Sequence, residues 1–338
     1  MKTDAAAAAA GVPGLVLRPY RGEADVADLV RVTNAALEAD GIPERRTEAD
    51  VAVDLRHPTP AFDATTDLVV AELDGAVVGH GRADWVDMTD GAREYRTGGE
   101  VHPEYRRRGI GRAIMRTNLA RLREIDAVRP TASPRVFGLW TNERSAGAAA
   151  LARAEGFEPV RWFFEMERPG IDRDLPQIPD LPDGLEIRAV EEDQMWQFWN
   201  ADVEAFQDHW GGFDASEENF RGWLERPTFR RELIVAAWAG DEIAAGVVNT
   251  IYTGENEQLG MRRGWLDSVF TRREWRRRGV ARALIARSLH LLAAEGMDTA
   301  MLGVDADNPS GALGLYESFG FRVVERGSAW HRPLEVAP

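Results

Sequence analysis

The sequence contains no cysteine and only one lysine, Lys2, so 40 of its 41 basic residues are arginine. Without cysteine the chain has no disulfides, no thiol nucleophile and no cysteine-bound metal. A P-loop, a protein kinase and a Schiff-base enzyme each depend on a lysine, and Lys2, in the expected N-terminal tail, suits none of them. The chemistry must therefore come from other side chains or from the backbone.

Other signatures are also missing. The six histidines form no pair at the spacing of a metal site, and no GxSxG motif marks a hydrolase nucleophile. No apolar run reaches the roughly 18 residues of a membrane span. Residues 1–13 are rich in alanine without a leucine-rich centre, which predicts a disordered tail rather than a signal peptide. These absences favour a cytoplasmic protein that uses no metal.

The charge is unevenly distributed. The formal net charge is -15, which disfavours nucleic acids and anionic membranes as partners. Two short stretches nevertheless concentrate arginine, EYRRRGIGRAIM at 104–115 and EWRRRGVARALI at 274–285. A local basic cluster in an acidic chain indicates a small polyanion bound in one pocket.

The two arginine clusters belong to an internal duplication. Arg106 and Arg276 are 170 residues apart, and GLVLRP at 14–19 precedes GLEIRA at 184–189 by the same interval. Residues 168–184 between the copies hold four prolines and predict an extended linker. A length of 338 residues also favours two domains. We therefore expect domains at 14–168 and 184–338, joined by a linker at 169–183.

Each half shows the same order of expected elements. An opening strand and a helical region precede a hairpin, with Asp74-Gly75 as the turn of the first one. A further strand then leads into the arginine cluster, and a helix begins at the glycine of that cluster. A late strand and a short helix follow and end in Gly-Phe, and a final strand closes the half. The opening strand, the helical region and the hairpin are expected at 15–18, 24–39 and 68–81 in the first half, and at 185–188, 191–205 and 233–248 in the second. This order predicts an α/β (α+β) fold in each half.

A glycine-bearing turn between a strand and a helix leaves several backbone N–H groups pointing outward. The helix dipole adds roughly half a positive charge at that end, so such a turn binds phosphate. The flanking arginines add charge-assisted hydrogen bonds. The residues expected to bind the polyanion are Arg276, Arg277, Arg278, Gly279, Val280, Ala281 and Arg282 in one half, and Val101, Arg106, Arg108, Gly109 and Gly111 in the other.

The order of strand, PEYRRRGIGRAIM and a late NxxxxxxLYxxxGF pattern resembles the GNAT N-acetyltransferase family. The layout, which ends in LGVDADNPSGALGLYESFGF, is similar to the tandem acetyltransferases of actinomycetes, mycothiol synthases among them. The resemblance covers nearly all of residues 14–335. It implies two tandem GNAT domains, each a mixed, mostly antiparallel sheet flanked by helices. It also implies that the polyanion is acetyl-CoA and that the acetyl group passes directly to an amine on a small molecule.

The resemblance also assigns roles within the C-terminal half. Tyr316 falls on the family's general acid, and Asn308 would bond the pantetheine arm. The strand residues Val269, Phe270 and Thr271 would pair with the same arm. His209 and Trp210 lie in the segment where the family builds its acceptor-binding wall, although a satisfied histidine and a core tryptophan explain them equally well.

The N-terminal half departs from the family pattern at the acid. Counting back from the Gly-Phe pairs gives an interval of 164 residues, so that Tyr316 corresponds to Ala152. That half therefore has no phenol at this place. We expect catalysis in the C-terminal half, while the N-terminal half still binds CoA or serves only as a structural partner.

Several alternatives stay open at this point. The proton acceptor is Asp267, where some relatives place a carboxylate, or Glu232, or a chain of waters. The acceptor is a thiol-bearing acid, an aminoglycoside, a polyamine or a peptide N-terminus. Two other functions compete with small-molecule acetylation: a non-catalytic sensor or scaffold that binds acyl-CoA, and a protein N-acetyltransferase.

Overall fold

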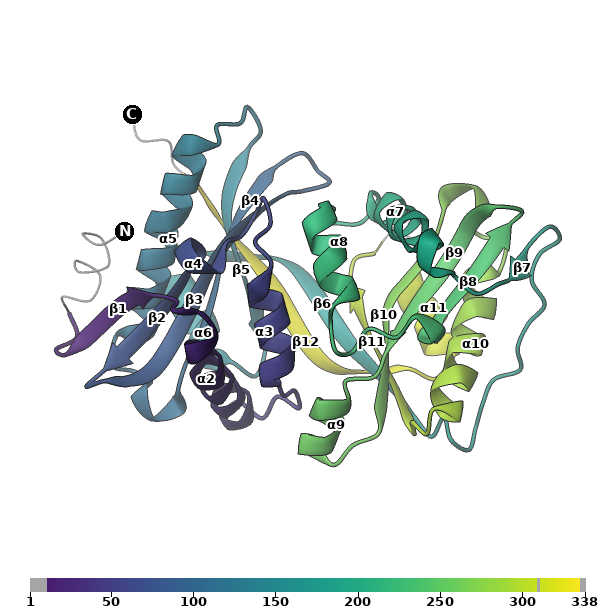
Figure 1. Cartoon of the computed structure of the whole chain (residues 1–338), viewed down its shortest axis with the longest axis horizontal. Coiled ribbons are helices and arrows are strands. Elements are labelled where there is room, and N and C mark those ends of the chain that lie inside the picture. Colours follow the sequence, from purple (N-terminus) through teal and green to yellow (C-terminus); the bar gives the residue numbers. More distant parts are fainter. Residues whose placement is uncertain (1–10, 309–310, 335–338) are drawn as a thin grey trace. The chain divides into compact units, whose positions relative to one another are not determined.

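The computed structural model describes residues 11–308 and 311–334, which form two compact units (Figure 1). Unit 1 comprises residues 11–161, 211–227 and 327–334, and unit 2 comprises residues 162–210 and 228–326. Most of the tail expected at 1–13 lies outside the described residues. The division at 14–168 and 184–338 stays a prediction about the repeat, because each unit also contains a segment from the other half of the sequence.

Unit 1 is built on a sheet in the order β1-β2-β3-β4-β5-β12. Helices α2 and α5 pack on its opposite faces, because α2 contacts Val70 and Val77 whereas α5 contacts Val69 and Val78. Its elements are β1 (Leu15–Pro19), α2 (Val26–Ala39), α3 (Glu48–Arg56), α4 (Ala64–Asp67), β2 (Leu68–Leu73), β3 (Ala76–Asp87), β4 (Arg93–Val101), α5 (Ile110–Val128), β5 (Arg135–Asn142), α6 (Ala146–Ala154) and α8 (Glu217–Leu224).

Unit 2 repeats this plan with the strand order β7-β8-β9-β10-β11-β6. The α10 face carries the main apolar core, in which Leu284, Leu289 and Leu292 are fully buried. Its elements are β6 (Glu158–Pro169), β7 (Glu186–Ile187), α7 (Met195–Phe206), β8 (Ile234–Ala239), β9 (Glu242–Thr250), α9 (Thr253–Leu259), β10 (Arg263–Thr271), α10 (Val280–Ala294), β11 (Thr299–Asp305) and α11 (Ala312–Ser318). The last strand, β12 (Arg322–Pro333), begins in unit 2, and its residues from Gly327 onward belong to the unit 1 sheet.

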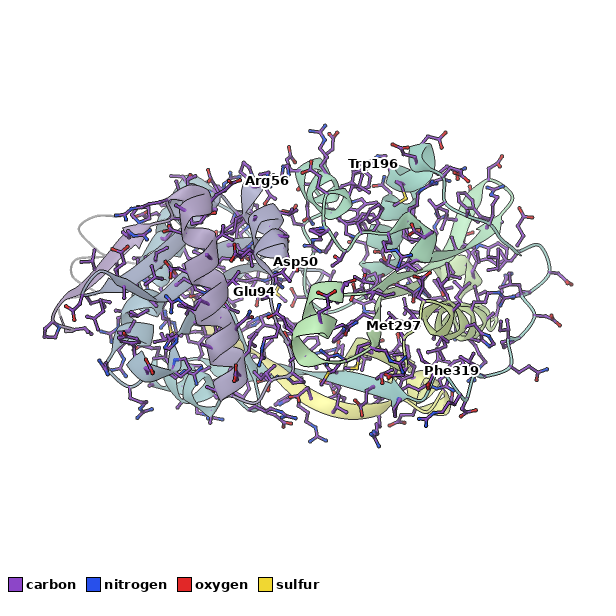
Figure 2. The ribbon with its side chains drawn as sticks, turned by 60° about the horizontal axis from the view of Figure 1, so that its bottom comes forward. Asp50, Arg56, Glu94, Trp196, Met297 and Phe319 are labelled. Atoms are coloured by element: carbon purple, nitrogen blue, oxygen red, sulfur yellow. The ribbon has the colours of Figure 1, made fainter. Side chains whose placement is uncertain are left out.

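The closing strands correct one expectation from the sequence. We expected each half to close with its own last strand, but β6 pairs with β11 and the end of β12 pairs with β5. Glu94 of β4, labelled in Figure 2, is almost fully buried and accepts hydrogen bonds from Arg96 (2.7 Å) and from His331 of β12 (3.0 Å). Because β5 and β11 are equivalent edges of a duplicated fold, exchanging the closing strands keeps the same antiparallel pairing.

The hairpins and opening helices are confirmed. Asp74 and Gly75 take left-handed φ angles of 52° and 83° between β2 and β3, as a two-residue hairpin turn requires. The helical regions expected at 24–39 and 191–205 correspond to α2 and α7, and α7 ends one residue beyond the expected range. Helices α3 and α8 are not evident from apolar spacing. They are capped at their N-termini by Thr47 and Ser216, whose side chains accept a hydrogen bond from a backbone N–H three residues later.

Two further results concern the described residues alone. None of their helices is both long and apolar enough to cross a bilayer. No group of three or more histidine, aspartate or glutamate side chains among them is arranged to hold a metal ion.

Candidate active site

Two neighbouring parallel strands separate at the same place in each unit. In unit 2 the pairing of β10 with β11 ends at Leu266 and Leu302, although both strands continue beyond these residues. In unit 1 the pairing of β4 with β5 ends at Arg96 and Gly138. Each unit thus has a gap between two strands where backbone groups are available to an extended ligand.

The gap of unit 2 begins at a β-bulge. Leu266 pairs with Asn249 and Ser268 pairs with Val248, so Asp267 is the extra residue of β10. Its carboxylate is exposed and accepts a hydrogen bond of 3.0 Å from the Tyr252 hydroxyl. The pairing of β4 with β3 in unit 1 is continuous over the same stretch. Bulges are frequent next to active sites because they redirect a side chain, so the bulge is a local specialisation of unit 2.

The turn that follows β10 presents a row of free backbone donors. Arg277 and Gly279 take left-handed φ angles of 60° and 85°, and α10 begins at Val280 without a capping side chain. Ala283 is the first helical residue whose N–H is bonded, to the carbonyl of Gly279. Within the described chain the N–H groups of residues 277–282 have no protein acceptor. A Cβ at Gly279 would meet nothing within 4 Å, so the turn leaves room for a phosphate group.

The turn of unit 1 has the same geometry. Arg107 and Gly109 take φ angles of 65° and 90°, and Ala113 is the first residue of α5 whose N–H bonds a carbonyl. The N–H groups of residues 107–112 also lack a protein acceptor in the described chain. Both halves therefore keep a turn of the kind that binds phosphate.

The first arginine of each cluster has a structural role that the sequence did not indicate. The Arg276 guanidinium donates to the carbonyls of Thr271 (2.9 Å) and Ala205 (3.0 Å) and to Asp208 (2.6 Å). Arg106 makes the equivalent bonds to Val101, Ala36 and Asp40 in unit 1. These arginines fasten the first helix of each unit to the strand that leads into the turn.

The remaining arginines of the C-terminal cluster are more exposed. Arg277 and Arg278 point into solvent, and Arg278 stacks at 4.9 Å on Trp275. Arg282 donates to the hydroxyl of Ser318 at 3.1 Å and so connects the first turn of α10 to α11. Arg108 of unit 1 is also exposed and lies 5.2 Å from the ring of Tyr105. These side chains fit the phosphate role better than Arg276 and Arg106.

The structural role of Arg276 predicts a loss of stability on its removal. Arg276→Ala is expected to lower the free energy of unfolding of unit 2 by about 1.5–3 kcal/mol, because charge-assisted hydrogen bonds to Thr271, Ala205 and Asp208 disappear. Urea denaturation followed by tryptophan fluorescence measures this loss. Arg278→Ala is the matched control and should cost less than about 1 kcal/mol, since that side chain has only an exposed ring contact. Equal stability of the two variants would contradict the fastening role.

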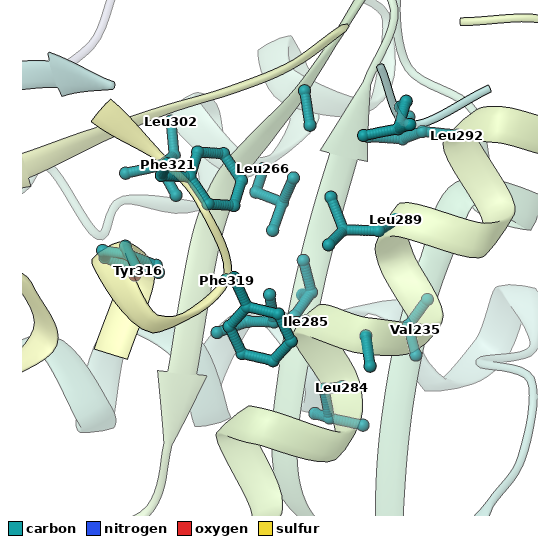
Figure 3. Close-up of a cluster of buried hydrophobic side chains, with 14 of the residues drawn as sticks. Val235, Leu266, Leu284, Ile285, Leu289, Leu292, Leu302, Tyr316, Phe319 and Phe321 are labelled. Atoms are coloured by element: carbon teal, nitrogen blue, oxygen red, sulfur yellow. The ribbon is translucent and has the colours of Figure 1, made fainter. Parts of the chain in front are cut away.

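Tyr316 lies on α11 at the edge of the unit 2 core (Figure 3). Its ring packs edge-on against Phe321 with the ring centres 6.1 Å apart, and the residue is only 7% exposed. Burial raises the pKa of Tyr316 to about 12, so the phenol keeps its proton at neutral pH. Its hydroxyl has no partner among the described residues and is not fully enclosed, so it is available to donate to a ligand. The equivalent residue of unit 1, Ala152, is fully buried.

The other residues expected around the gap lie on several elements. Val269 packs on the core, Phe270 is buried, and the buried hydroxyl of Thr271 has no partner in the described chain. Asn308 is half-buried in the turn after β11, where its N–H bonds the carbonyl of Asp305. These positions surround the separated ends of β10 and β11, which fits the expected contacts with an extended ligand.

The loop after α7 also reaches this end of unit 2. The His209 ring packs on Phe206 with their centres 4.4 Å apart, and Trp210 lies 5.8 Å from Phe163 of β6. Burial lowers the pKa of His209, Arg276 lowers it further, and the charges of Asp305 and Asp208 oppose them. The imidazole is therefore mainly neutral at pH 7 and lies within the electrostatic reach of Asp305, at the end of β11.

A carboxylate that the sequence analysis did not single out faces this strand. Asp202 of α7 accepts a hydrogen bond of 2.7 Å from the hydroxyl of Ser268, the residue directly after the bulge. Burial raises the pKa of Asp202 to about 6, and the bond from Ser268 opposes that rise. Glu232, by contrast, is exposed and paired with Arg230, which lowers its pKa. No sequence motif marks Asp202, since its position depends on how α7 packs on β10.

Unit 1 contains a cavity of about 330 Å³. Each arginine that lines it is paired with a carboxylate: Arg82 with Asp84, Arg96 with Glu94, and Arg226 with Asp54. The cavity therefore offers no uncompensated positive charge to a polyanion. Its lining residues are Val53, Asp54, His57, Thr59, Ala61, Phe62, Arg82, Asp84, Trp85, Val86, Arg96, Trp140, Asp214, Glu218, Asn219, Gly222 and Arg226.

Comparison with known protein families and relatives agrees with this geometry. The model of the acetyltransferase (GNAT) family matches residues 195–321, and that of the acetyltransferase (GNAT) domain matches residues 64–159. A protein named mycothiol acetyltransferase from Salinispora arenicola is 31% identical, with 88% of this chain and 90% of the relative covered. A protein of the same name from Kineococcus radiotolerans is 31% identical over 94% of this chain and 95% of its own length.

Solved structures show the same fold. A GCN5-related N-acetyltransferase from Sphaerobacter thermophilus superimposes with a TM-score of 0.70 at 23% identity, covering 96% of this chain and 98% of its own. A tandem GNAT protein from the clavulanic acid biosynthesis pathway gives a TM-score of 0.70 at 20% identity, with 96% and 100% covered. The solved structures share the fold, and the family models together with the relatives at 31% identity establish the family. The chain is an acyltransferase that belongs to the GNAT acetyltransferase family and carries two GNAT domains.

Proposed function

We propose that this chain transfers the acetyl group of acetyl-CoA to a primary amine on a small molecule, and that the transfer takes place in the C-terminal half. GNAT acetyltransferases use acetyl-CoA, and the free N–H groups of residues 277–282 fit its pyrophosphate. The observation that favours the C-terminal half as the catalytic one is the presence of a side chain that can act as general acid. Tyr316 supplies a protonated phenol in unit 2, whereas its counterpart Ala152 has no functional group.

In this proposal each residue of the C-terminal half has one task. Acetyl-CoA, when bound, supplies an acetyl group that is activated as a thioester, with the thiol of CoA as the leaving group. The turn after β10 and the side chains of Arg277, Arg278 and Arg282 hold its phosphates. Its pantetheine arm is oriented by Asn308 and by the edge of β10 that follows Leu266. Tyr316 donates its proton at the position of the departing sulfur. His209 and Trp210 border the acceptor.

The names of the relatives suggest the acceptor. Two proteins with 31% identity over most of the chain are named mycothiol acetyltransferase, so desacetylated mycothiol is the first amine to test. An aminoglycoside, a polyamine and a peptide N-terminus are further acceptors of the same chemical type. Because such acceptors and acetyl-CoA are soluble metabolites, we place the reaction in the cytoplasm.

The N-terminal half has a smaller part in this proposal. Its turn keeps the same free N–H groups as the C-terminal turn, at residues 107–112, with Gly109 and Gly111 in the same places as Gly279 and Ala281. We propose that this turn, with Val101 and Arg108 beside it, still binds CoA. Arg106 contributes by holding the turn in place rather than by touching phosphate.

The direct test is an acetyl-transfer assay with the full chain. Acetyl-CoA is supplied with desacetylated mycothiol, an aminoglycoside, spermidine or a short peptide, and the acetylated product is identified by mass spectrometry while consumption of acetyl-CoA is followed by the loss of its thioester absorbance. The expected result is acetylation of at least one small amine. Binding of acetyl-CoA in calorimetry without transfer to any amine would favour a sensor or scaffold. Transfer to lysine peptides alone would favour a protein acetyltransferase.

A further inference from the structure

Acetyl transfer to an amine also needs a group that removes a proton from the amine. Asp202 is placed for this task by its element and by its partner. It lies on α7, which packs on β9 and β10, and it accepts the hydrogen bond from Ser268 at the start of the gap between β10 and β11. A carboxylate here borders the segment of β10 along which the acetyl group is expected to lie.

Asp202 and Tyr316 lie on opposite faces of the unit 2 sheet. Phe198 of α7 packs edge-on against Phe270 of β10 with ring centres 5.3 Å apart, so the Phe270 side chain points toward α7. Ser268 is two residues earlier and points to the same side, as its bond to Asp202 requires. Tyr316 belongs instead to the core on the α10 face, together with Val280 and Leu284. An acid and a base are thus placed on the two sides of one gap.

The duplication supplies an independent argument. Arg106 donates to the carbonyl of Ala36 and Arg276 donates to that of Ala205, so Ala36 and Ala205 are equivalent positions in the two units. Three residues earlier in each helix stand Thr33 and Asp202, and Thr33 is bonded to His80 at 2.9 Å. Unit 1 therefore has no carboxyl group where unit 2 has Asp202, just as it has Ala152 where unit 2 has Tyr316. The two groups occur together in one half and are absent together from the other.

We propose that Asp202 is the general base of the C-terminal active site, an inference that rests on the proposed amine acetylation. The amine nitrogen forms its bond to the acetyl carbon while the carbon–sulfur bond breaks. The electron pair of that bond stays on sulfur, which takes the proton of Tyr316, and the proton of the amine passes to Asp202. Solvent then removes the proton from Asp202 and returns one to Tyr316, so that both groups are reset.

The surroundings of Asp202 suit a base that works near neutral pH. Burial raises its pKa to about 6, and the bond from Ser268 is the opposing influence. The carboxylate is therefore mostly ionised at pH 7 and still basic enough to accept a proton. The charged groups on α7 and on the segments that contact it are Glu192, Asp193, Glu204, Glu242, Arg263, Asp267, Arg272 and Arg276, and none of them contributes to this shift.

Asp267 is the competing carboxylate. It is exposed at the bulge and bonded to Tyr252, and the substitution Asp267→Asn tests it directly. If Asp267 were the base, that variant would lose turnover and Asp202→Asn would not. The two isosteric variants therefore separate the candidates without changing the shape of the site.

The decisive experiment compares Asp202→Asn with the parent and with Asp193→Asn, an exposed aspartate just before α7. Using the amine that the parent acetylates, kcat of Asp202→Asn is expected to fall by roughly 10²- to 10⁴-fold, with calorimetric affinity for acetyl-CoA and the melting temperature unchanged. The parent kcat should decline as pH falls through about 6, because protonated Asp202 cannot accept the proton. That decline should be absent from the residual rate of Asp202→Asn and present in Asp193→Asn.

A second variant, Ser268→Ala, is expected to change the pH profile of kcat while the Asp202 carboxylate stays in place. The bond from Ser268 lowers the pKa of Asp202, so Ser268→Ala should move the acid decline of kcat to higher pH. Parent-like turnover and an unchanged acid decline in Asp202→Asn would overturn the assignment while leaving the proposed function intact. A parent that binds acetyl-CoA but acetylates no amine would remove the proposed function and the base assignment with it.

Discussion

Tyr316→Phe is expected to lower kcat by roughly 10²- to 10⁴-fold while affinity for acetyl-CoA stays at the parent value. The phenol lies at the edge of the unit 2 core, where burial raises its pKa to about 12, so it carries a proton over the whole range of an ordinary assay. Phenylalanine keeps the ring contact with Phe321 and removes only the proton donor. Steady-state kinetics with the acetylated amine, combined with calorimetry for acetyl-CoA, measures both parts of the expectation.

The control for this variant is Tyr20→Phe, which removes the same atom from a half-buried tyrosine of unit 1. It should leave kcat unchanged. The pH profile gives a second check, since ionisation of Tyr316 cannot cause an alkaline loss of activity well below pH 12. Full turnover in Tyr316→Phe would exclude the phenol as the acid and would remove the main reason for placing catalysis in the C-terminal half.

The duplication is the feature that the sequence predicts best. Counting residues gave intervals of 170 at the arginine clusters and 164 at the Gly-Phe pairs. The last paired residues of the parallel strands repeat both numbers, because Arg96 corresponds to Leu266 and Gly138 corresponds to Leu302. Short motifs with glycine, arginine and aromatic residues retain their spacing because they determine local backbone geometry. Positions defined by such motifs could therefore be predicted from the sequence.

The features that the sequence did not reveal depend on contacts between distant segments. The exchange of β6 and β12 between the sheets cannot be read from a strand pattern, because β5 and β11 offer equivalent edges. The role of Arg276 depends on Ala205 and Asp208, which lie about 70 residues earlier. In the sequence Asp202 resembles any other helical aspartate, and only the packing of α7 brings it beside Ser268. Patterns within one segment reveal the local turn but not the partners that complete the site.

The geometry also refines the reason for the arginine cluster in an acidic protein. The most deeply engaged arginine of each cluster, Arg276 or Arg106, neutralises a carboxylate of its own unit, Asp208 or Asp40. The backbone N–H groups of the turn, rather than this side chain, are then the principal donors for phosphate. Affinity for acetyl-CoA should therefore respond more strongly to a charge placed at the turn than to the loss of Arg276.

Ala281→Glu places such a charge and is expected to weaken acetyl-CoA binding by roughly 10³-fold. Ala281 is in the first turn of α10, and its N–H is one of the free donors. Two unit charges about 4 Å apart interact by about 4 kcal/mol at an effective dielectric constant of about 20, and each 1.4 kcal/mol is tenfold in affinity. A glutamate at a helix N-terminus stabilises the helix, so the variant should fold normally. Calorimetric titration with acetyl-CoA measures the loss.

Ala294→Glu is the matched control, because it makes the same change at the exposed last residue of the same helix. The two positions are 13 residues apart, or about 20 Å along the axis, so the control charge is screened from the turn. Binding should survive in Ala294→Glu and be lost from one site in Ala281→Glu. Any binding that remains in Ala281→Glu then belongs to the N-terminal turn. Parent-like binding at both sites would show that the phosphates lie elsewhere, since a carboxylate within the donor row cannot be electrostatically neutral to them.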